Sequence, residues 1–66
     1  MTAQELQREV DRLLLRVRGL VAVSELLEQR GASVLELTAH REEIDPLRDR
    51  IARLISDNRD ALGAAA

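Results

Sequence analysis

His40 is the only histidine of the chain, and two glutamates stand at helical spacings from it. Glu36 precedes it by four residues and Glu43 follows it by three, so a helix would place the three side chains on one face. Imidazole and carboxylate groups bind metal ions, and helical bundles build such sites from facing helices. One histidine supplies few ligands, and the Glu-x-x-His spacing is absent. We therefore expect no metal, and we place His40 in the core beside Ser24, as a polar layer that sets the register of the helices.

The sequence contains no enzyme motif. The chain has no cysteine, and we find no glycine-rich phosphate loop, no nucleophile elbow and no plausible catalytic triad. We therefore expect a non-enzymatic protein that holds no cofactor.

The segment HREEIDPLRDRIARLISDNR, residues 40–59, resembles the long first helix of the all-helical chorismate mutases. The resemblance consists mostly of heptad spacing. It implies that Arg41 and Arg59 occupy the positions of substrate-binding arginines in that family, whereas Pro46 departs from the family's pattern. Because the residues themselves carry no catalytic motif, we keep the non-enzymatic interpretation.

The charged residues give little sign of nucleic-acid or membrane binding. Ten basic residues, all arginines, and twelve acidic residues leave a net charge of −2. The two signs are interleaved, which is typical of solvated, salt-bridged helix faces. No Phe, Tyr or Trp is present to stack on bases. Residues 23–31 are loosely similar to the first helix and turn of helix-turn-helix proteins, but residues 34–37 are apolar and acidic, unlike a recognition helix.

Local signals near position 31 predict two helices. Gly31 suits the left-handed residue that follows a helix. Ser33 is a favoured N-cap, and Glu36 completes a Ser-x-x-Glu capping box. We expect one helical-hairpin domain over residues 1–66, with a helix over about 3–30, a loop over about 31–33 and a helix over about 34–62.

Apolar residues recur in alternating steps of three and four along both predicted helices, which is a heptad seam. Facing pairs, such as Leu20 with Ile44 and Leu13 with Ile51, lie at equal chain distances from the predicted loop. This agreement predicts an all-α antiparallel hairpin with coiled-coil-like packing. The two seams comprise Leu6, Val10, Leu13, Val17, Leu20, Ser24, Leu27, Leu37, His40, Ile44, Leu47, Ile51, Leu54, Asn58 and Ala61.

Pro46 falls inside the second predicted helix, where proline removes one backbone hydrogen bond and costs about 3 kcal/mol. The heptad phase runs unbroken from Ile44 to Leu47, so we expect a continuous helix that is kinked near Pro46. The alternative is a new helix that begins there, with Asp45 as its N-cap. Gly19 lies opposite this region, and we expect it to let the first helix accommodate the bend.

The first helix carries more apolar side chains than one seam can bury. A chain of 66 residues buries only about 60% of its unfolded surface, and without cysteine it has no disulfide to compensate. We expect two copies to associate into a four-helix bundle; the alternative is a groove for a helix of another protein. The expected interface consists of Leu14, Leu15, Val21, Leu26, Ile55 and Leu62.

These observations favour a small structural or adaptor protein that acts through protein–protein association. Two alternatives stay open: a small regulator, antitoxin-like or an anti-activator, that masks a helix of its target, and a DNA-associated accessory protein. The first residues, Met1 to Glu5, lack the basic and apolar regions of a signal peptide, and no apolar run is long enough to cross a membrane. We therefore expect a cytoplasmic location.

Overall fold

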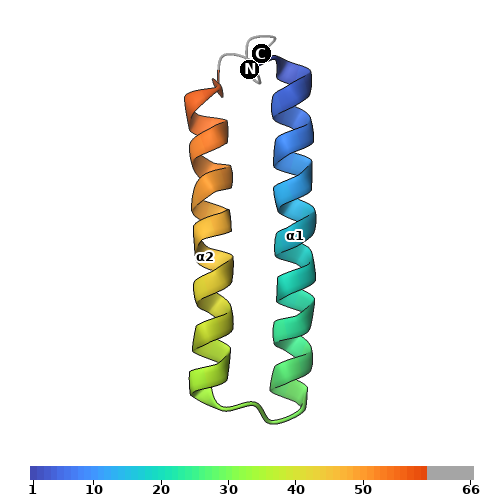
Figure 1. Ribbon diagram of the computed structural model, residues 1–66, viewed down its shortest axis with the longest axis vertical. Helices are drawn as coiled ribbons and strands as arrows, with labels where there is room; N and C mark the ends of the chain where they lie inside the picture. The colour runs from blue at the N-terminus through green and yellow to red at the C-terminus, as the bar shows by residue number, and fades with distance from the viewer. Residues whose placement is uncertain (60–66) are drawn as a thin grey trace.

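A computed structural model describes residues 1–59 as two helices, α1 (Ala3–Gln29) and α2 (Val34–Asp57), joined by a short loop. The helices run side by side in opposite directions, and the described part contains no β-strand (Figure 1). The prediction of an all-helical fold whose two helices pack against each other is therefore confirmed. Helix α2 ends at Asp57, and the last residues of the second helix as it was predicted lie outside the described part.

Both helices begin at a side chain that caps the first turn. At α2, Ser33 Oγ accepts a hydrogen bond from the Glu36 N–H at 3.2 Å, which is one half of the predicted capping box. At α1, Thr2 Oγ1 accepts from the Glu5 N–H at 3.1 Å. The Thr-x-x-Glu pattern carries the same signal in the sequence. Each cap gives a partner to an N–H that the helix end leaves free, and it contributes about 1 kcal/mol.

Gly31 ends α1 in the left-handed conformation, with a φ of 78°. Its N–H donates to the Glu28 carbonyl at 3.0 Å, and the Ala32 N–H donates to the Leu27 carbonyl at 2.9 Å. These two bonds form a Schellman motif, which satisfies carbonyls that the last helical turn leaves free. Because a Cβ is strained at this φ, glycine lets the chain turn back toward α2 at the lowest cost.

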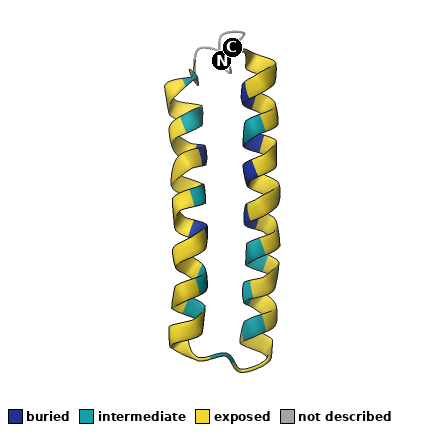
Figure 2. Cartoon of the chain, in the orientation of Figure 1, coloured by how far each residue is buried: buried dark blue, intermediate teal, exposed yellow. Residues whose placement is uncertain are grey.

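The core is a single stripe between the helices, and it lies on the predicted seams. On α1, the buried residues run from Leu6 to Val17, and none lies between Val17 and the loop (Figure 2). Toward the loop the seam contains Ser24 and His40, and its residues are only half-buried. Leu20, Leu47 and Leu54 are half-buried and pack against the buried set. The buried side chains are Leu6, Val10, Leu13, Val17, Ile44 and Ile51.

Helix α2 is continuous through Pro46, so the alternative of a new helix capped by Asp45 is wrong. Proline has no N–H to donate to the carbonyl four residues earlier, which belongs to Glu42. Both Pro46 and Glu42 are exposed, so water can bind that carbonyl and no buried polar group is left unpaired. The kink near Pro46 stays a prediction.

Gly19 has no close neighbour from α2. A Cβ built on this residue would meet no heavy atom within 4 Å, and its φ is not positive. This observation contradicts the expectation that Gly19 makes room for a bend in α2. The residue lies on the exposed side of α1, where glycine lowers helix propensity.

The two glycines should therefore respond to alanine in opposite directions. We expect Gly19→Ala to raise the free energy of unfolding by about 1 kcal/mol through helix propensity. Gly31→Ala should lower it by about 1–2 kcal/mol, because alanine is strained in the left-handed region. Urea unfolding followed by circular dichroism, at one chain concentration, measures both. If both variants changed the free energy of unfolding in the same direction, the roles given to Gly19 and Gly31 would be contradicted.

Candidate interaction surface

One side of the hairpin continues the apolar core outward. Val21 is half-buried and packs against the core, and Leu14 lies two turns before it on the same side of α1. On α2, Ile55 follows the core residue Ile51 by one turn. Leu14 is 39% exposed and Ile55 is 41% exposed. We call Leu14, Val21 and Ile55 the flank surface.

Arginines and acids of both helices surround Val21 on this side. They line a hollow between the helices, and Arg48 in that hollow lies two turns before Ile55 on α2. Val21 of α1 and Ile55 of α2 therefore share one side of the hairpin. Two arginines and two carboxylates balance their charges there. The hollow is lined by Val21, Ser24, Glu25, Arg41, Ile44, Asp45 and Arg48.

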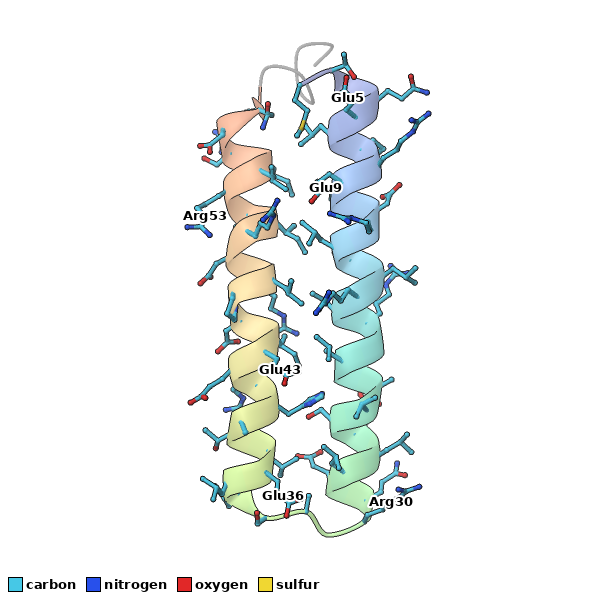
Figure 3. All side chains as sticks on the ribbon, viewed as in Figure 1. Glu5, Glu9, Arg30, Glu36, Glu43 and Arg53 are labelled. Atoms are coloured by element: carbon cyan, nitrogen blue, oxygen red, sulfur yellow. The ribbon has the colours of Figure 1, made fainter. Side chains whose placement is uncertain are left out.

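The other side of the hairpin is charged. Glu9 points toward α2 (Figure 3), and its carboxylate lies 2.9 Å from a guanidinium nitrogen of Arg12 and 3.5 Å from one of Arg50. The Glu9–Arg50 pair joins the two helices across an exposed edge, where such pairs contribute about 0–1 kcal/mol. In the sequence, the two residues of the pair each stand directly before a seam residue, Glu9 before Val10 and Arg50 before Ile51. A second hollow here is lined by Arg12, Leu13, Arg16, Leu47 and Arg50.

The expected interface residues divide between two faces of α1 instead of forming one surface. Leu15 stands two residues from both Leu13 and Val17, which are buried, so it points away from α2. It is 71% exposed, and Leu26, on the same outer face, is 50% exposed. A partner that covers the flank surface would leave these two leucines uncovered. Leu62 lies outside the described residues.

His40 ties α2 to the backbone of α1. Its Nε2 lies 2.6 Å from the Leu20 carbonyl oxygen, and because a carbonyl only accepts, Nε2 is the donor. Ser24, the expected neighbour of His40, is half-buried. Within residues 1–59 no hydrogen bond joins the two side chains. The contact of His40 is thus a direct bridge from a seam position of one helix to the main chain of the other.

The residues near His40 do not gather into a metal site. Glu36 and Glu43 are both exposed on α2 (Figure 3), and Glu36 belongs to the first turn of that helix. In the part of the chain that the structure describes, no group of three His, Asp or Glu side chains is placed to hold a metal ion.

No known protein family, curated protein or solved structure matches the chain. Neither α1 nor α2 is long and apolar enough to cross a membrane. Arg41 and Arg59, which the resemblance to chorismate mutases singles out, are exposed, and Arg41 lines the hollow on the flank side. The strongest candidate for a functional feature is therefore the exposed apolar surface of the hairpin.

The hydrogen bond from His40 to the Leu20 carbonyl predicts which substitutions at position 40 destabilise the hairpin most. His40→Ala should lower the free energy of unfolding by about 1–2 kcal/mol, because it removes a hydrogen bond and half-buried carbon atoms. His40→Gln keeps a donor that can reach a carbonyl, so it should lower the free energy of unfolding by less than His40→Ala does. Urea unfolding at one chain concentration measures both variants. If glutamine were as destabilising as alanine, donation to Leu20 would not be what holds position 40.

Proposed function

We propose that this chain is a non-enzymatic structural or adaptor protein that acts through helix–helix association, and that two copies pair through their flank surfaces into a four-helix bundle. The observation that carries the proposal is the continuity of the flank surface with the core. Val21 packs on the buried residues, and Leu14 and Ile55 extend the same apolar side while staying about 40% exposed.

The limited core supports association. Each helix has one neighbour, and only six apolar side chains are buried along the whole described hairpin. A domain of this size is marginal without a disulfide, a metal or a partner subunit. Burying a leucine or isoleucine fully stabilises by roughly 1.5–3 kcal/mol, so covering Leu14 and Ile55 adds a useful fraction of the stability of a small domain.

A second copy fits the flank surface because that surface can complement itself. In a two-fold dimer the same patch serves both partners, so every apolar contact occurs twice. The mixed charges of Arg41, Arg48, Glu25 and Asp45 allow each copy to meet opposite charges on the other. The heptad spacing of both helices suits the shallow crossing angle of about 20° found in four-helix bundles.

The test is the solution mass, measured by light scattering after size exclusion across a dilution series. We expect the native chain at twice 7.4 kDa. The pair Leu14→Gln and Ile55→Gln should raise the dissociation constant on the order of 1,000-fold, because four side chains across the axis each lose roughly 1 kcal/mol.

Leu15→Gln is the matched control, since it makes the same change one residue away on the outer face. It should leave the mass unchanged. A helical native chain that stays at 7.4 kDa at every concentration would refute the dimer, and equal dissociation of both variants would refute the flank surface as its interface.

A further inference from the structure

A second apolar stripe runs along the outer face of α1. Leu15, Gly19, Ala22 and Leu26 each follow a buried core residue by nine residues, which is about two and a half helical turns. They therefore point directly away from α2. All four are exposed, and a Cβ added at Gly19 would meet open space. We call these four residues the outer stripe.

The spacing of the outer stripe is that of a helix-packing seam. Its steps of four, three and four residues repeat the heptad pattern that lies against α2 on the opposite side. Two leucines stand at the ends and two small residues between them, so a helix laid along the stripe can approach closely at its centre. A second copy bound at the flank surface lies on another side of α1 and does not cover the stripe.

The charges beside the outer stripe are mainly positive. The positions three or four residues from its members hold four arginines and two acids. Arg12 pairs with Glu9, whereas within residues 1–59 the other three arginines form no ion pair. Arg30 points away from α2 at the loop end (Figure 3). The arginines are Arg12, Arg16, Arg18 and Arg30, and the acids are Asp11 and Glu25.

We infer that the outer stripe docks an acidic amphipathic helix of another protein. Leucines at heptad spacing accept the apolar face of such a helix, and the flanking arginines attract glutamates or aspartates on its edges. A second copy of α1 is a weaker occupant, because it offers only two acids, Asp11 and Glu25, to the four arginines beside the stripe. The inference uses a surface distinct from the flank surface, so it does not depend on the proposed dimer.

Two synthetic helical peptides test this inference. Both carry leucine at the heptad seam positions; one has glutamate on both edges and the other has lysine at the same places. Fluorescence anisotropy with the full chain should show the glutamate peptide binding at least about 10-fold more tightly than the lysine peptide. Added salt should reduce this difference, because exposed charges are screened.

Matched variants locate the peptide on the protein. The double variant Leu15→Gln and Leu26→Gln should bind the glutamate peptide at least about 10-fold more weakly than the native chain does. The double variant Leu14→Gln and Ile55→Gln should bind it with unchanged affinity. The pair Arg16→Glu and Arg18→Glu should reverse the preference between the two peptides. Circular dichroism of each variant checks that the helices remain.

Equal affinity for the two peptides, or no binding of either, would overturn the inference. So would binding that is lost with the flank-surface pair and kept with the outer-stripe pair, because the peptide would then lie on the wrong face. The mass of the chain in the same samples separates the two proposals. If the chain is a dimer and does not bind the glutamate peptide, only the docking inference is refuted. If the chain is a monomer and binds the peptide, only the proposed dimer is refuted.

Discussion

A hairpin of two helices can bury only one stripe on each helix, and most features of this molecule follow from that limit. Leu6, Val10, Leu13 and Val17 fill the stripe on α1, and Ile44 and Ile51 are the buried residues on α2. With a single neighbour for each helix, most apolar residues outside the stripe are exposed within residues 1–59, although Val21 is half-buried. The exposed leucines and valines beyond the core are therefore available for contact with another chain.

The stripe is also uneven along its length. The buried apolar residues lie from Val17 of α1 and Ile44 of α2 toward the open end, whereas the part between these residues and the loop contains Ser24 and His40 and is only half-buried. There the helices are joined by other means: the bond from His40 to the Leu20 carbonyl, and the Schellman motif that Gly31 closes. Local backbone geometry and one cross-helix hydrogen bond thus hold the helices together at the loop end of the hairpin, and burial of apolar side chains holds them together along the rest.

The remaining surface sorts into sides of different chemistry. One side continues the core through Leu14, Val21 and Ile55, and the opposite side carries the Glu9–Arg50 pair. The outer face of α1 combines exposed leucines with arginines. Because the three surfaces lie at different angles around the hairpin, the proposed dimer through the flank surface would leave the outer face of α1 open to a different partner.

The sequence by itself determined the two helices, the turn at Gly31, the cap at Ser33 and the seam residues, because each depends on local backbone preferences or on a heptad period readable from the residues. It did not determine what surrounds each seam residue. The tertiary structure decided that His40 donates to the Leu20 carbonyl and that Gly19 faces open space. It also divided the expected interface between two faces, separating Leu15 and Leu26 from the flank surface. These outcomes depend on the angle of each residue around its helix and on where the neighbouring helix lies, and both become definite only when the two helices are packed together.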